Sequence, residues 1–143
     1  LLLFFSGFSR NAPDFAKEQI RLISKKNKEL QTMGKLCDQA EKIITSKSTP
    51  IHDFGKLLNE QWKLKCKMSS RITNGEIDYI INKGIESGAL GGKLLGAGGG
   101  GFILFFAKPE NHLQIRKTLH KLLHVPFRFE FSGSQIIYFG HHA

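Results

Sequence analysis

The amino-acid sequence predicts an α+β fold in which helices pack on one face of a mainly antiparallel sheet of four to five strands. Three observations support this prediction. An apolar run opens the chain, two strand-like runs lie on either side of a glycine-rich segment near residue 100, and helical periodicity fills the long interval between the first run and the glycines. A length of 143 residues with 41% hydrophobic residues suits one globular domain, residues 1–143.

The first element is an apolar strand over Leu1–Phe8, which ends near Ser9. Pro13 and Asp14 suit the first turn of a helix that continues to about Ser46. Apolar residues recur along it at three- and four-residue spacing, with a break expected at Gly34: Leu30, Met33, Leu36, Cys37, Ala40, Ile43 and Ile44.

Two further helices precede the glycines. Thr49 is the expected N-cap of the first, followed by Pro50 at its first position and Asp53 in its first turn. The second begins near Asn74 and ends at Gly88. Their apolar stripes predict buried faces, made of Ile51, Phe54, Leu57, Leu58 and Trp62 in the first and of Ile77, Ile80, Ile81 and Ile85 in the second.

The rest of the chain predicts an interior strand, a helix and two more strands. Phe102–Ala107 is apolar on both faces, as an interior strand would be. A helix opens at Pro109 and closes before Pro126. Phe127–Phe131 then alternates phenylalanines with Arg128 and Glu130, which favours a strand with Phe127, Phe129 and Phe131 on one face, and a turn leads to a last strand over Ile136–Phe139.

Glycine is concentrated in one place. Eight of the fifteen glycines lie between Gly88 and Gly101, in GALGGKLLGAGGGG. At roughly 0.5–1 kcal/mol for each glycine in regular structure, eight of them cost about 4–8 kcal/mol. That is a large fraction of the roughly 5–15 kcal/mol that stabilises a typical domain. We therefore expect this segment to bring bare backbone N–H groups close to an anionic ligand.

Two common phosphate-binding motifs do not fit the segment. Gly96, Gly98 and Gly101 satisfy G-x-G-x-x-G, but a dinucleotide site requires a helix after the glycines, and here a strand follows. A Walker A loop would need Gly-Lys-Ser/Thr at its end. The remaining interpretation is a short strand at Lys93–Leu95, a tight loop at Gly96–Gly101 and a second strand. The alternative is a purely structural role in a bulge or in close helix-to-sheet packing.

These residues carry a resemblance to a known family. GALGGKLLGAGGGGFILFF resembles the third signature motif of the GHMP small-molecule kinases, the superfamily of galactokinase, homoserine kinase, mevalonate kinase and phosphomevalonate kinase. The flanking segments LLLFFSGFSRNA, LNEQWKLKCKMSSRITNGEID and VPFRFEFSGSQIIYF are similar to the C-terminal half of the D-glycero-D-manno-heptose 7-phosphate kinases. The resemblance covers nearly the whole chain and implies a ferredoxin-like C-terminal domain.

The resemblance implies a cytoplasmic enzyme that transfers the γ-phosphoryl group of ATP to a hydroxyl of a heptose 7-phosphate, with Mg²⁺. The family's ATP-cradling loop and its catalytic aspartate belong to an N-terminal domain and have no counterpart in this sequence, so we expect no catalytic residue here. The chain would bind neither ATP nor Mg²⁺ alone and would be inactive alone. Its partners would be its own N-terminal domain and the sugar phosphate, and an uncovered apolar face would favour self-association.

The family's third motif lies beside the phosphate, which carries over to Gly96, Ala97, Gly98, Gly99, Gly100 and Gly101. Many relatives have threonine at the position of Leu95 and cysteine at that of Phe102, so the backbone amides are left to contact the ligand. Lys93 and Arg10 are candidate substrate-binding residues, because a cation or a guanidinium fork suits a phosphate. A solvated strand-end lysine and a surface ion pair are the alternatives.

The charge leaves a second class of function open. With 21 basic and 12 acidic residues the formal net charge is +9, which suits phosphorylated small molecules, nucleic acid or an acidic partner. A basic α+β module that binds RNA on its sheet is therefore the alternative function. It predicts that Phe127, Phe129 and Phe131 face solvent, whereas the kinase interpretation buries them. Trp62, on an apolar stripe, is expected in the core.

The sequence offers little support for a disulfide-rich protein, a membrane span or a metal site. Two cysteines do not make a disulfide framework, so a reducing cytosol is the default. The opening LLLFF is too short to span a bilayer. His120 and His124 are four residues apart, but Lys121 stands where a metalloprotease has glutamate and no third ligand is evident, so no metal site is expected.

Overall fold

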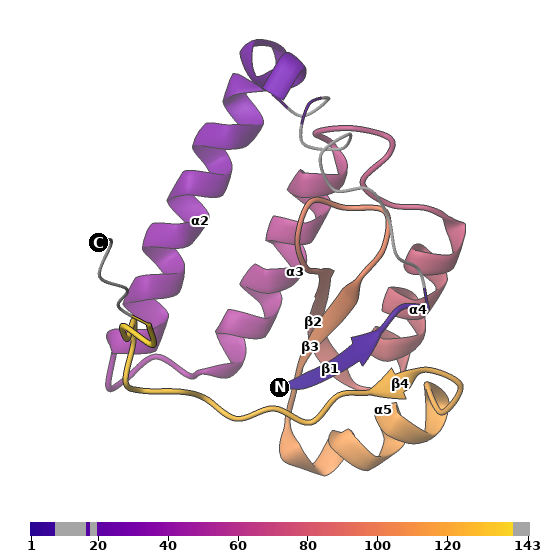
Figure 1. The fold of residues 1–143 in the computed structure, drawn as a ribbon. Helices are drawn as coiled ribbons and strands as arrows, with labels where there is room; N and C mark the ends of the chain where they lie inside the picture. Colours follow the sequence, from indigo (N-terminus) through magenta and orange to yellow (C-terminus); the bar gives the residue numbers. More distant parts are fainter. Residues whose placement is uncertain (8–16, 18–19, 139–143) are drawn as a thin grey trace, which may run out of the picture.

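The structure, a computed structural model, describes residues 1–7, 17 and 20–138 (Figure 1). Four antiparallel strands form one sheet in the order β2-β3-β1-β4. The strands are β1 (Leu2–Phe5), β2 (Ala89–Leu94), β3 (Phe102–Ala107) and β4 (Leu123–His124). The predicted α+β class with a four-stranded antiparallel sheet is therefore confirmed.

Helices fill the connections between the strands. They are η1 (Ile23–Lys25), α2 (Asn27–Thr45), α3 (His52–Cys66), α4 (Gly75–Glu86), η2 (Pro109–Asn111) and α5 (His112–Thr118). None of these helices combines the length and the apolar composition that a membrane crossing requires. In Figure 1, α2 lies beside α3 and away from the sheet.

The core cluster combines strand residues with residues of α3, α4 and α5. Phe4 pairs with Ile103 and Leu2 with Phe105, and these four side chains are buried on one face. Gly84 of α4 lies against the Phe105 ring on that face. The Phe106 side chain alternates to the other face, where Gly55 of α3 lies against it. Trp62 is 5% exposed and belongs to the core cluster, as predicted.

One predicted helix cap is confirmed and another is wrong. The Asn74 side chain accepts hydrogen bonds from the backbone N–H groups of Glu76 (3.1 Å) and Ile77 (2.9 Å), which caps α4. Thr49, in contrast, does not cap α3. Its own N–H donates to Ser46 Oγ at 2.9 Å, and α3 follows a turn that starts at Pro50 without a side-chain cap.

The predicted break at Gly34 is also wrong. Helix α2 passes through Gly34 without interruption, and the irregular turn lies earlier, in the short 3₁₀ helix at Ile23–Lys25. The predicted start of this helix at Pro13 and Asp14 lies outside the described residues, as do Phe8 and Phe139 at the ends of two predicted strands.

The strands predicted at Phe127–Phe131 and from Ile136 do not form. Residues 125–138 contain no regular element, and the side chains of Phe127, Phe129 and Phe131 are 42%, 69% and 92% exposed. The burial that the kinase interpretation predicted is therefore wrong in this chain. The last strand instead forms at Leu123–His124, where the sequence pattern had predicted the end of a helix.

The β1–β4 register explains this difference. Phe4 pairs with His124 and Phe5 with Leu123, and the Val125 N–H donates to the Leu3 carbonyl at 2.8 Å. Among the described residues, no further hydrogen bond to β1 follows Val125. A strand needs a neighbour for its hydrogen bonds, so alternation alone does not order this segment.

Candidate functional site

The glycine segment forms a hairpin loop between β2 and β3. The Leu95 N–H donates to the Phe102 carbonyl at 2.8 Å and closes the hairpin, and the loop runs from Gly96 to Gly101. Gly98 has a φ of +110°, and a Cβ there would lie 2.7 Å from the Ile72 Cα. Only glycine satisfies both the left-handed backbone and this close approach. The predicted strand–loop–strand arrangement is confirmed, although the first strand covers Ala89–Leu94 and not the predicted Lys93–Leu95.

Three residues distant in sequence hold the loop. Ser6, at the end of β1, donates its N–H to the Gly101 carbonyl at 2.8 Å and accepts the Gly101 N–H on its Oγ at 3.1 Å. Ile72, in the connection between α3 and α4, accepts the Gly99 N–H at 2.6 Å. Lys65 of α3 donates from Nζ to the Gly96 carbonyl. The loop is therefore fixed at both ends and in its middle.

Some loop amides are satisfied within the fold and others are not. Gly99 and Gly101 donate to Ile72 and Ser6, as above. In the part of the chain that the structure describes, the N–H groups of Gly96, Gly98 and Gly100 have no acceptor. Gly98 and Gly100 are buried residues. Buried N–H groups are rarely left without a partner, so these amides point to a missing acceptor.

The loop provides a cationic environment of its own. Gly96 is exposed, so the loop is not sealed in the interior. The Lys65 ammonium donates a hydrogen bond to the Gly96 carbonyl. Fixed N–H donors of this kind stabilise an anion without reorganising when it binds. An oxyanion such as a phosphate is the ligand that fits this donor set.

The two other predicted site residues are not brought to the loop by any described contact. The Lys93 side chain donates from Nζ to Gln61 Oε1 of α3, and burial lowers the pKa of its ammonium. Arg10 lies outside the described residues. A substrate-binding role for either residue stays a prediction.

Metal ligands are sparse in the described ranges, 1–7, 17 and 20–138. They contain no group of three or more histidine, cysteine, aspartate or glutamate side chains placed to hold an ion. His120 Nδ1 lies 2.9 Å from the Lys117 carbonyl, a local helix-end contact.

Sequence reasoning missed the supports of the loop. Ser6 falls inside the strand predicted over Leu1–Phe8, and nothing in the local pattern assigns a role to Lys65. The spacing of Lys63, Lys65 and Lys67 near a helix end is a weak signal for a cationic site, and nothing in the sequence indicates the Ile72 carbonyl. Such contacts join residues up to 95 positions apart.

Comparison with known proteins identifies the family of this chain. The family model "GHMP kinases C terminal" matches residues 40–123, more than half of the chain. The chain is 31% identical over 123 residues to a D-glycero-alpha-D-manno-heptose 7-phosphate kinase of Campylobacter jejuni, covering 84% of this chain and 35% of that protein. It is 36% identical over 69 residues to a mevalonate kinase of Methanocaldococcus jannaschii, covering 48% of this chain and 21% of that protein.

Solved structures of kinases of this family have a similar fold. The crystal structure of the Methanococcus jannaschii mevalonate kinase superposes with a TM-score of 0.71 at 26% identity, covering 87% of this chain and 37% of that chain. The sequence thus spans only about a third of the length of the heptose 7-phosphate kinase and of this structure. A hairpin of bare amides, the matching family model and the shared fold lead to one conclusion. This chain belongs to the GHMP kinase family and corresponds to its C-terminal domain.

Proposed function

We propose that this chain is the C-terminal domain of an ATP-dependent heptose 7-phosphate kinase and that its glycine loop lines the site of phosphoryl transfer. The observation that carries the proposal is the set of loop amides, Gly96, Gly98 and Gly100, that have no acceptor among the described residues. The heptose 7-phosphate specificity rests on the similarity to the Campylobacter jejuni enzyme.

The loop acts by positioning and by neutralising charge. Phosphoryl transfer depends on in-line placement and on balancing the charge of the transferring group. A hydrogen bond to a charged acceptor contributes roughly 1.5–3 kcal/mol. The Ser6 and Ile72 contacts hold the amides in place, so their orientation is set before the phosphate arrives. The Lys65 ammonium adds positive charge at the start of the loop.

ATP supplies the phosphoryl group and Mg²⁺ balances its charge when both are bound. The residues of this chain that fit ATP are the loop amides, which would hold phosphate oxygens. Ligands for Mg²⁺, the ATP-cradling loop and a catalytic base would come from an N-terminal domain. We therefore propose a cytoplasmic two-domain enzyme, and we expect the 143-residue chain alone to be inactive.

A chimera tests this function. The matching segment of the Campylobacter jejuni heptose 7-phosphate kinase is replaced by this chain, and phosphate transfer from labelled ATP is measured with heptose 7-phosphate and with mevalonate. We expect transfer to the heptose phosphate only. Gly98→Ala in the chimera should lower kcat by about tenfold or more, because the added Cβ meets Ile72 and displaces the amides.

The control is Gly34→Ala, since a Cβ at Gly34 meets nothing within 4 Å and the residue lies in α2. Transfer to mevalonate in preference to the heptose phosphate would overturn the specificity. A Gly98→Ala chimera as active as the Gly34→Ala chimera would overturn the role of the loop. Detectable phosphorylation of a heptose phosphate by the chain alone would overturn the expected inactivity.

One observation keeps the RNA-binding alternative testable. Phe127, Phe129 and Phe131 are exposed, as that alternative predicts, although they lie in irregular chain and not on a sheet. If the segment stacks on bases, single-stranded RNA should bind with an affinity that falls steeply between about 50 and 200 mM salt. Fluorescence anisotropy of a labelled oligonucleotide measures this. No binding at the lower salt concentration would exclude the alternative.

A further inference from the structure

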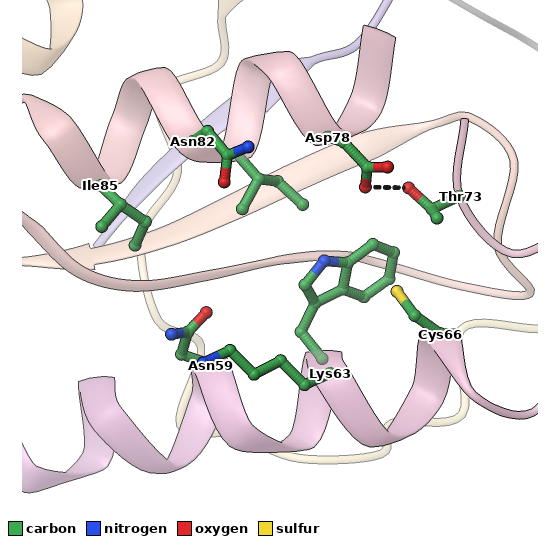
Figure 2. A pocket seen from close by; sticks show the side chains of 9 residues that line it. Asn59, Lys63, Cys66, Thr73, Asp78, Asn82 and Ile85 are labelled. Atoms are coloured by element: carbon green, nitrogen blue, oxygen red, sulfur yellow. Dashed lines mark hydrogen bonds between the residues drawn. The ribbon is translucent and has the colours of Figure 1, made fainter. Parts of the chain in front are cut away.

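A second concave site lies between α3 and α4, on residues that the glycine loop does not include (Figure 2). We call it the α3–α4 groove. Its volume is about 540 Å³, within the range of small-molecule sites. It is lined by Asn59, Trp62, Lys63, Cys66, Thr73, Asp78, Ile81, Asn82 and Ile85.

The groove contains a buried donor without an acceptor. Trp62 is 5% exposed, and its indole N–H makes no hydrogen bond to any group in the described part of the chain. The indole nitrogen can only donate. A buried polar group without a partner requires an explanation such as a bound ligand or an ordered water. Trp62 lines the groove, so an acceptor placed there can satisfy it.

Two amides face each other across the same space. Figure 2 shows the Asn59 side chain rising from α3 and the Asn82 side chain reaching down from α4. Within residues 20–138, neither amide makes a side-chain hydrogen bond. An asparagine amide both donates and accepts, which matches a ligand hydroxyl, itself a donor and an acceptor.

The charges in the groove are separated. The Lys63 side chain extends toward Asn59, whereas Asp78 lies toward the other end, near Cys66 (Figure 2). Thr73 Oγ1 donates to Asp78 Oδ1 at 2.5 Å, which leaves further acceptor capacity on the carboxylate. Burial raises the pKa of the Cys66 thiol to about 11, so this thiol is neutral at physiological pH. Ile81 and Ile85 supply apolar surface to the groove, with Ile85 at the Asn59 end (Figure 2).

We propose that the α3–α4 groove binds a small polyhydroxylated anion, of the class of a pentose or hexose monophosphate. Its anionic group is held at the Lys63 and Asn59 end, and its hydroxyls bond to Asn82, to the Trp62 N–H and to Asp78. The C–H edges of the sugar contact the two isoleucines. This site is separate from the glycine loop and does not depend on the function proposed above.

The chain carries its own reporter for this site, because Trp62 is its single tryptophan. The 143-residue chain is titrated with ribose 5-phosphate while Trp62 emission is followed, and calorimetry provides an independent affinity. We expect saturable binding. The variants Asn82→Leu and Lys63→Gln should each weaken it by about tenfold, the change that loss of one hydrogen bond to a charged or polar group implies.

Matched controls separate the groove from general charge effects. Lys42→Gln removes a helical lysine of α2 that does not line the groove, and it should leave the affinity unchanged. Ribose and inorganic phosphate should each bind more weakly than ribose 5-phosphate. Circular dichroism establishes that each variant is folded before its affinity is compared.

Three results would overturn the proposal. They are the absence of saturable binding by both methods, equal weakening by Lys42→Gln and Lys63→Gln, and binding of inorganic phosphate as tight as that of ribose 5-phosphate. Tighter binding of the zwitterion glycine would also overturn it, since that result would assign the separated charges to an amino acid.

Discussion

Ser6 illustrates how a single side chain supports the glycine loop. It is 2% exposed, and its Oγ accepts the Gly101 N–H. Ser6→Ala leaves that N–H without its acceptor, and an unsatisfied buried donor costs about 1–3 kcal/mol. We expect the free energy of unfolding, measured in urea, to fall by this amount. Ser70→Ala, at an exposed position, is the control and should change it by less than about 0.5 kcal/mol. Equal effects would show that the Ser6 contact does not stabilise the fold.

The two cysteines should differ in their reactivity because their burial differs. Cys37 is exposed, whereas Cys66 is partly buried, and its pKa is raised to about 11 first by burial and then by the Asp78 charge. The thiolate is the reactive form, and at pH 8 it makes up only ~0.1% of a thiol with this pKa. We expect iodoacetamide to modify Cys37 at least about tenfold faster.

Peptide mapping by mass spectrometry over a time course measures both rates. In concentrated guanidinium chloride the two rates should converge, because unfolding removes the burial of Cys66. A Cys66 rate equal to that of Cys37 in the native chain would contradict the burial.

At the scale of the helices, two glycines that both lie in helix interiors differ in their packing. Gly34 and Gly84 both lie inside helices, and a Cβ at Gly34 meets nothing within 4 Å, whereas one at Gly84 would lie 2.2 Å from Phe105 Cε1. Gly34→Ala should therefore stabilise the chain by about 0.5–1 kcal/mol through helix propensity. Gly84→Ala should destabilise it by about 1–3 kcal/mol through overpacking.

Thermal and urea unfolding of the two variants measure these opposite changes in stability. Two changes of the same sign would contradict the close approach of α4 to the sheet. The pair is informative because helix propensity alone predicts the same gain for both substitutions.

Local signals predicted the helices well where the cause is local. The Asn74 cap depends on contacts two and three residues away, so the sequence contains all of it. The Thr49 cap was wrong because α3 begins only at His52, after a turn in which the Asp53 N–H donates to the Pro50 carbonyl. The glycine loop could be recognised from composition, but its anchors could not. Ser6 and Gly101 are 95 residues apart, and only the antiparallel pairing of β1 with β3 brings them together.

At the scale of the whole molecule, the segment after β4 shows where sequence pattern fails. The alternation at Phe127–Phe131 is a valid strand signal, yet a strand also needs a hydrogen-bonding neighbour. In the described part of the chain, the pairing of β4 with β1 ends at Val125, and no strand lies beside residues 127–131. The pattern therefore describes what the segment is able to form with a neighbour, and not what it forms in this chain.

A truncation tests this interpretation. Removing residues 128–143 should change the melting temperature by less than about 3 °C, because the described residues of this segment are exposed and none belongs to the core cluster. The same truncation should reduce self-association, since it removes Phe129, Phe131, Ile136, Ile137 and Tyr138, each at least 69% exposed. Calorimetry and light scattering measure the two effects. A large loss of stability would mean that the segment packs on the fold.

The connection between α3 and α4 touches both sites at adjacent residues. Ile72 accepts the Gly99 N–H on its carbonyl, and Thr73 lines the α3–α4 groove and bonds to Asp78. The Ile72 carbonyl and the Thr73 nitrogen belong to one rigid amide plane, so neither can tilt without the other. If occupancy of the groove tilts that plane, the hairpin responds, and thermodynamic reciprocity then requires an anion at the hairpin to alter affinity in the groove by the same factor.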